Sequence, residues 1–151
     1  MANSTLNASE TFLRYARGLP RGKLDWCPST ASRSALSMLQ EVAQDPRDLA
    51  KLMNDELVPG LGSEQYFERL RKEKLEWTTL EECERVLEFN ISILVAAMNN
   101  FPDSRLNERV VEPWGQETTF AELAMYQYWN TTWHTGQIAY IQTLLGDGKS
   151  Y

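Results

Sequence analysis

The sequence predicts an all-α protein, an antiparallel-type four-helix bundle with short extra helical segments between its second and third principal helices. Apolar residues recur at three- and four-residue spacing in separate segments, which is the pattern of helices that bury one face. No segment shows the apolar–polar alternation of a half-buried strand. A chain of 151 residues, 42% of them hydrophobic, suffices for one core, so we expect residues 1–151 to form one domain.

The first two principal helices are delimited by caps and by helix-breaking residues. The first begins at Ser4 or Ser9 and ends at Arg17, because a glycine and a proline follow. The second covers residues 31–44. We expect Pro46 to restart or kink it, because proline lacks the N–H that continues a helix.

The third helix begins at Thr78 or Thr79, where a glutamate three residues later predicts a capping box. Before it, residues 45–57 and 62–77 predict short helical segments, the first opened by an aspartate cap and the proline. After it, residues 103–117 contain the run RVVEPWG, which predicts no more than an extended strap across the bundle.

Composition and charge exclude several classes of function. A net charge of −6 argues against a nucleic-acid partner, because binding phosphates requires a basic face. No stretch approaches eighteen consecutive apolar residues, and the N-terminus lacks the basic start and apolar core of a signal peptide. We therefore expect a cytoplasmic protein with no membrane partner. Cys27 and Cys83 lack the spacing of a metal or redox motif and are interpreted as reduced structural thiols.

The last helix, expected over residues 118–145, has an unusual apolar stripe. Its middle carries polar side chains about one turn apart: Gln127, Asn130, His134 and Gln137. An unpaired polar side chain in an apolar interior costs roughly 1–3 kcal/mol, so this run implies a hydrogen-bond network, a ligand, a metal or a water-filled cavity. We expect Gln127 and Gln137 to line such a pocket. His134, the single histidine, also fits a satisfied core residue.

A family resemblance is carried by four segments in this order: KLDWCP, RSALSMLQEVA, PWG and WHTGQIAYIQTLLGD. They resemble the DinB-like superfamily over nearly the whole chain, and HTGQI is the most specific part. The resemblance implies a four-helix bundle and a divalent metal, zinc or nickel, held by three histidines on the second and last helices. The corresponding positions here are Glu41, eight residues after Arg33, and Asn130 and His134. An amide oxygen is a weak ligand for zinc or nickel, so the affinity for either metal should be lower than that of a three-histidine site. The alternative is a polar pocket without a metal.

Two functions of different class follow from the resemblance. Characterised relatives, including mycothiol-dependent maleylpyruvate isomerase and bacillithiol transferases, are metal-assisted isomerases and transferases that use low-molecular-weight thiols. The resemblance therefore implies a thiol S-transferase or isomerase type of enzyme, in which the metal lowers the pKa of a thiol or water. Because two of the three ligand positions differ, the alternative is a non-enzymatic bundle that binds a small molecule or acts as a dimeric interaction module. Spacing places no serine or cysteine as a nucleophile beside His134.

Aromatic residues on the last helix predict an interface. Tyr126, Trp129, Trp133 and Tyr140 lie beside or opposite the polar stripe, in a sector that a monomeric bundle would keep wet. Exposed tryptophan and tyrosine are typical of interfaces, and we expect a homodimer through this helix. The alternative is that the segments at residues 46–57 and 63–76 cover these rings within one chain.

Overall fold

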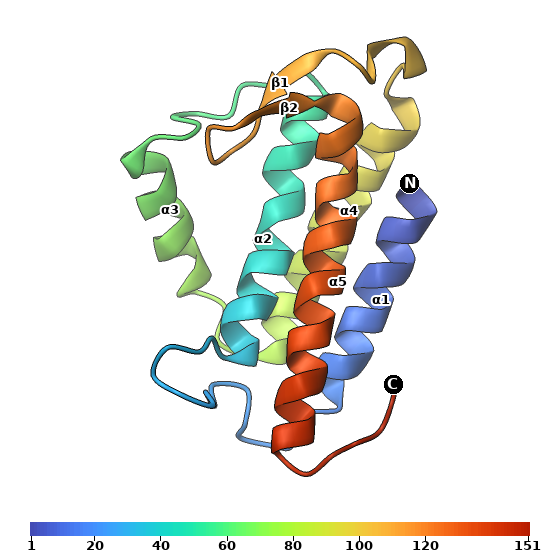
Figure 1. Cartoon of the computed structure of the whole chain (residues 1–151). Helices are drawn as coiled ribbons and strands as arrows, with labels where there is room; N and C mark the ends of the chain where they lie inside the picture. Colours follow the sequence, from blue (N-terminus) through green and yellow to red (C-terminus); the bar gives the residue numbers. More distant parts are fainter.

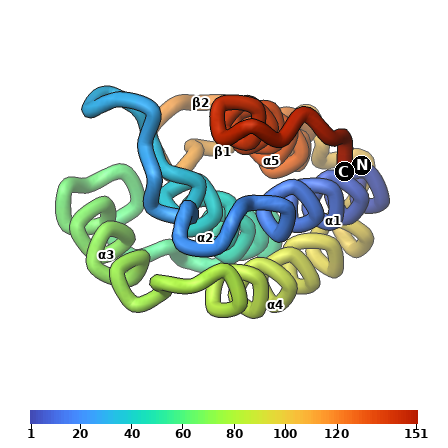
Figure 2. The backbone as a smooth tube through the Cα atoms, turned by 90° about the horizontal axis from the view of Figure 1, so that it is seen from below, coloured from blue at the N-terminus to red at the C-terminus, as the bar shows by residue number.

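Four long helices lie side by side in the computed structural model, which describes residues 1–151 (Figure 1). They are α1 (Ala2–Arg17), α2 (Ala35–Met53), α4 (Leu80–Asn100) and α5 (Phe120–Leu144). α2 and α1 each pack against both α4 and α5, which closes a ring of four helices around one hydrophobic core (Figure 2). The predicted all-α four-helix bundle is confirmed.

A short helix outside the bundle, α3 (Glu64–Lys74), confirms the expected helical segment between the second and third principal helices. It runs back along α2, so that α2 and α4 point the same way and α1 and α5 point the other way (Figure 1). The expected antiparallel-type order therefore needs correction, because neighbouring α2 and α4 are parallel. None of the helices combines the length and apolarity that crossing a bilayer requires.

Helix starts follow local capping chemistry. Thr79 caps α4 and forms the predicted capping box with Glu82, and Thr119 and Glu122 form the same box at the start of α5. α2 begins later than expected, at Ala35. The side chain of the preceding serine accepts a hydrogen bond from the backbone N–H three residues on, which fixes the helix start.

α2 continues through Pro46, so the expected restart at that residue is wrong. Proline has no N–H, and the carbonyl of Val42 four residues earlier therefore lacks its usual helical donor. The side chain of Gln127 on α5 replaces that donor, with Nε2 3.0 Å from the Val42 oxygen. Asn90 on α4 donates similarly to the carbonyl of Ala43 at 2.8 Å. Amide side chains from two neighbouring helices thus serve the carbonyls just before the proline.

The linker after α4 is more structured than the expected strap. After a 3₁₀ turn, η1 (Asp103–Arg105), strands β1 (Arg109–Val111) and β2 (Glu117–Thr119) pair antiparallel in a hairpin. Gly115 in the connecting turn has a φ of +88°, a conformation that glycine adopts without steric cost. Strands of three residues are too short to display an alternation that sequence inspection can recognise.

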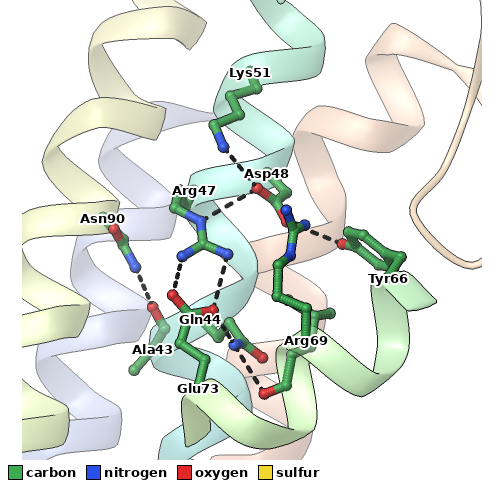
Figure 3. Close-up of polar contacts among 10 residues, drawn as sticks. Ala43, Gln44, Arg47, Asp48, Lys51, Tyr66, Arg69, Glu73 and Asn90 are labelled. Carbon is green, nitrogen blue, oxygen red and sulfur yellow. Dashed lines mark hydrogen bonds and ion pairs between the residues drawn. The ribbon is translucent and has the colours of Figure 1, made fainter. Parts of the chain in front are cut away.

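Polar side chains hold α3 against α2 (Figure 3). Asp48, whose side chain is only 3% exposed, accepts a hydrogen bond from the Tyr66 hydroxyl at 3.1 Å. Arg47 forms an ion pair with Glu73, and Gln44 donates to the same carboxylate at 2.7 Å. Tyr66 is the single buried residue of α3, so these polar contacts, more than apolar packing, position the helix.

The exposed aromatic rings of α5 are not covered by the chain itself. Trp129, Trp133 and Tyr140 are 56%, 57% and 64% exposed, whereas Tyr126 is half-buried beneath Trp114. The alternative expectation, that the segments between α2 and α4 bury these rings, is therefore wrong for three of the four.

The bond from Gln127 to Val42 predicts an energetic coupling with Pro46. Gln127→Leu should lower the free energy of unfolding by about 1–3 kcal/mol, because the Val42 carbonyl loses its donor. In a Pro46→Ala background the alanine N–H supplies that donor, so the same substitution should cost about 1 kcal/mol less. A double-mutant cycle measured by urea denaturation checks this.

The matched control for the cycle is Gln142→Leu. Gln142 is also buried on α5 and donates to a backbone carbonyl, that of Tyr15, at 2.8 Å. No proline lies four residues after Tyr15, so this substitution should be additive with Pro46→Ala. Additivity of Gln127→Leu with Pro46→Ala would contradict the assigned role of Gln127.

Candidate functional site

Glu41 on α2 and His134 on α5 meet in the interior of the bundle. His134 Nε2 lies 3.1 Å from Glu41 Oε1. The His134 side chain is 4% exposed and that of Glu41 is 25% exposed, so the contact is largely shielded from water. The structure thus brings together two of the three positions that the family resemblance implied, Glu41 and His134.

Arg33 lies on the other side of Glu41. Its Nη2 atom is 2.7 Å from Glu41 Oε2, and it also donates to the carbonyl of Ser37 at 3.0 Å. Burial by itself raises the pKa of Glu41, but the hydrogen bond from His134 and the charge of Arg33 outweigh it and lower the pKa to about 2. Glu41 is therefore ionised at neutral pH.

Gln137 completes the cluster. Its Oε1 atom lies 2.6 Å from His134 Nδ1, one turn further along α5. A side chain therefore engages each ring nitrogen, Glu41 at Nε2 and Gln137 at Nδ1. A carboxylate oxygen accepts only, so Nε2 donates to Glu41; the contact at Nδ1 then needs either a second ring N–H that donates to the Gln137 oxygen or a Gln137 amide turned so that its NH₂ donates to Nδ1. We call the linked side chains Arg33, Glu41, His134 and Gln137 the polar chain. The interpretation of His134 as a satisfied core histidine agrees with this arrangement.

Asn130 does not join the polar chain. Its Nδ2 atom donates instead to Asp45 Oδ2, at 3.0 Å. Burial and the neighbouring Glu41 carboxylate raise the pKa of Asp45 to about 7, because both disfavour a second negative charge. Sequence reasoning missed Asp45 as a site residue because it was interpreted as the cap of a helix restarting at Pro46. In a continuous helix it lies one turn after Glu41 on the same face, and that spacing could have identified it.

The other expected pocket residue, Gln127, has a structural partner. It is fully buried, and its amide donates to Val42 and also to the Thr131 hydroxyl at 3.1 Å. It does not line either of the two cavities that flank the polar chain, whereas Gln137 lines the larger one.

The donor set around His134 does not fit a divalent metal. The Glu41 carboxylate, the one strong oxygen ligand among Glu41, Asn130 and His134, is already neutralised by the Arg33 guanidinium. A cation placed at this carboxylate would be repelled by that fixed charge. Asn130 turns its amide N–H toward Asp45, and no cluster of three His, Cys, Asp or Glu side chains with metal-binding geometry is present. These residues form a hydrogen-bonded network instead.

Two cavities flank the polar chain. The larger, about 900 Å³, lies between the connector that precedes α2 and the exposed face of α5, where Arg33 and Gln137 contribute beside aromatic rings. The smaller, about 260 Å³, is lined by Glu41 and Asp45 of α2 together with residues of α3, the hairpin turn and α5. Both are concave and mainly apolar with a few polar groups, as small-molecule sites are.

Solved structures with the same fold were found, although no protein-family model and no curated protein match the sequence. A DinB-like protein of Bacillus subtilis, YjoA, superposes with a TM-score of 0.69 at 13% identity, over 99% of this chain and 94% of its own. A mutant of mycothiol-dependent maleylpyruvate isomerase superposes with a TM-score of 0.72 at 12% identity. That match covers 91% of this chain but 58% of the isomerase. The chain described here thus has the DinB-like fold.

Proposed function

We propose that this chain is a metal-free, non-catalytic binding protein built on the DinB-like bundle. The observation that carries the proposal is the closed polar chain, in which the glutamate and the histidine are each engaged on both sides by other side chains. A catalytic imidazole needs a nitrogen within reach of a substrate proton. His134 has neither a free nitrogen nor an exposed ring.

The thiol S-transferase or isomerase alternative has less support. Such chemistry requires a centre that stabilises a thiolate, by a metal or by a free cationic group. Zinc or nickel at His134 would have to displace Arg33 from Glu41. Within the chain, burial raises the pKa of the Cys83 thiol to about 12, and Cys27 lies exposed on the connector before α2, so neither supports a nucleophile beside His134.

Binding of a small molecule is the function that the cavities support. The polar chain fixes α5 against α2, and the connector and α3 enclose space on either side of that contact. A binding site of this kind needs a rigid frame and a few convergent polar groups, and it needs no reactive side chain.

We further propose that the molecule acts as a homodimer through α5. From Leu123 to Leu144 this helix carries no Asp, Glu, Lys or Arg. The rings of Trp129 and Trp133 nevertheless face solvent and stack on each other, with centroids 6.0 Å apart. An exposed helical face with aromatic rings and no charge favours association with an identical face, which closes a two-fold dimer.

Metal binding tests the non-catalytic proposal. Protein purified without a histidine tag should show no stoichiometric binding of Zn²⁺ or Ni²⁺ by calorimetry, and its melting temperature should not rise with either ion, because Arg33 holds the carboxylate. A variant with Arg33→Met, Glu41→His and Asn130→His serves as the positive control and should gain zinc affinity. One equivalent bound by the wild type and lost in His134→Gln would overturn the proposal.

Light scattering at micromolar concentration tests the dimer. We expect a mass of twice 17.4 kDa for the wild type and about 17.4 kDa for Trp133→Lys, which places a charge in the proposed interface. Phe89→Lys is the matched control, because Phe89 is 65% exposed on α4, away from α5, and should leave the dimer intact. A wild-type mass near 17.4 kDa would remove the dimer.

A further inference from the structure

The smaller cavity is lined by aromatic rings and by carboxylates. The rings are those of Tyr66 and Phe67 of α3, Trp114 of the hairpin turn and Tyr126 of α5. Glu41 and Asp45 line it from α2. At about 260 Å³ it is slightly smaller than the roughly 300–1,000 Å³ of drug-sized sites, which fits a small molecule.

The aromatic walls are held in place by their neighbours. The rings of Trp114 and Tyr126 pack with centroids 4.2 Å apart, and those of Tyr66 and Phe67 with centroids 5.3 Å apart. The Tyr66 hydroxyl is fixed by its bond to Asp48, which belongs to the contacts that pin α3 to α2 (Figure 3). The cavity therefore exists before any ligand binds, and a ligand need not order its walls.

Asp45 brings a carboxylate with spare acceptor capacity to this cavity. One of its oxygens accepts a bond from Asn130, and the carboxylate forms no ion pair. Glu41, by contrast, is paired on both oxygens, with Arg33 and with His134. A carboxylate without an ion pair, in a small cavity lined by aromatic rings, can accept a positive charge of limited size.

We propose that this cavity binds a small organic ammonium ion, with its charge at Asp45 and its alkyl groups against the aromatic rings. The proposal rests on the small-molecule-binding function proposed above and specifies its ligand class. Aromatic faces attract cations through their quadrupole, and alkylated ammonium groups fit them because they are weakly hydrated and apolar at the surface. A neutral molecule of the same shape lacks both the ring attraction and the ion pair.

Two basic residues of α3 also line the cavity. The Arg71 guanidinium is ion-paired with Glu64, so its charge is compensated. Lys74 has no ion-pair partner and lowers the pKa of Asp45, but burial and Glu41, which raise that pKa, have larger effects. Lys74 therefore opposes a bound ammonium, which has to compete with it for Asp45. Lys74→Met should tighten ammonium binding severalfold.

Asp45 makes binding depend on pH. The charged groups that act on it are Glu41 and Asp48 of its own helix, Arg33 before that helix and Lys74 of α3, while Tyr126 of α5 is coupled to it and Asn130 of α5 donates to it. With its pKa raised to about 7, Asp45 is protonated below neutral pH and cannot pair with an ammonium group. Affinity should thus rise about tenfold per pH unit below pH 7 and level off above it.

Calorimetry with choline tests the proposal, using 3,3-dimethylbutan-1-ol as a neutral molecule of the same shape. At pH 8 choline should bind at least tenfold more tightly than the alcohol. Asp45→Asn should lower choline affinity at least tenfold and abolish its dependence on pH between 6 and 8. Asp103→Asn, which removes an exposed carboxylate elsewhere, is the matched control and should change nothing.

A second variant keeps the test informative if Asp45→Asn fails to fold. Trp114→Leu removes one wall at a partly exposed position and should weaken choline binding while sparing the fold. Equal binding of choline and the alcohol would overturn the ammonium assignment and leave a small-molecule site. Binding of neither, together with stoichiometric Zn²⁺ binding that needs His134, would overturn the proposed function as well.

Discussion

The hydrogen-bonded contact between Glu41 and His134 joins α2 to α5 and governs the chemistry of the polar interior. Burying a carboxylate is costly unless a positive charge and hydrogen bonds compensate it. Arg33 supplies the charge and His134 the hydrogen bond, and the pKa of Glu41 falls to about 2 as a result. The same compensation leaves no vacant ligand for a metal. In this bundle of the DinB-like fold, Glu41 and His134 are thus paired with other side chains of the same chain.

The polar stripe of α5 is the seam along which this helix meets α2. Gln127 reaches the carbonyl exposed by Pro46, Asn130 reaches Asp45, and His134 reaches Glu41. Each of these three residues therefore has a partner on α2, whereas Gln137 contacts His134 within α5. Such a seam fixes the register of two helices more strictly than apolar packing alone, since a shift by one residue would leave several buried groups unpaired.

The principal helices could be predicted from the sequence, because periodicity and capping residues are local signals. The meeting of Glu41 with His134 was implied by the family resemblance and not by any local pattern. Other features depended on contacts between distant segments. Pro46 is a local signal for a break, but the Gln127 side chain of α5 supplies a donor to the Val42 carbonyl that the proline leaves without one, and the helix continues. Because a break was expected at Pro46, Asp45 was interpreted as a helix cap and not as a site residue. Arg33 belongs to a segment that carries the family resemblance. Its ion pair with Glu41 could not be predicted, because it depends on how the connector between α1 and α2, residues 18–34, lies against α2.

The claim that both nitrogens of His134 are engaged is open to direct measurement, because the chain contains a single histidine. Proton–nitrogen NMR of the labelled imidazole should show a ring N–H protected from exchange with solvent. Its signal should move in Glu41→Gln, which weakens the partner of Nε2, and should stay unchanged when Zn²⁺ is added to the wild type. A rapidly exchanging ring, or a ring nitrogen signal that shifts on addition of Zn²⁺, would contradict the account of a closed, metal-free network.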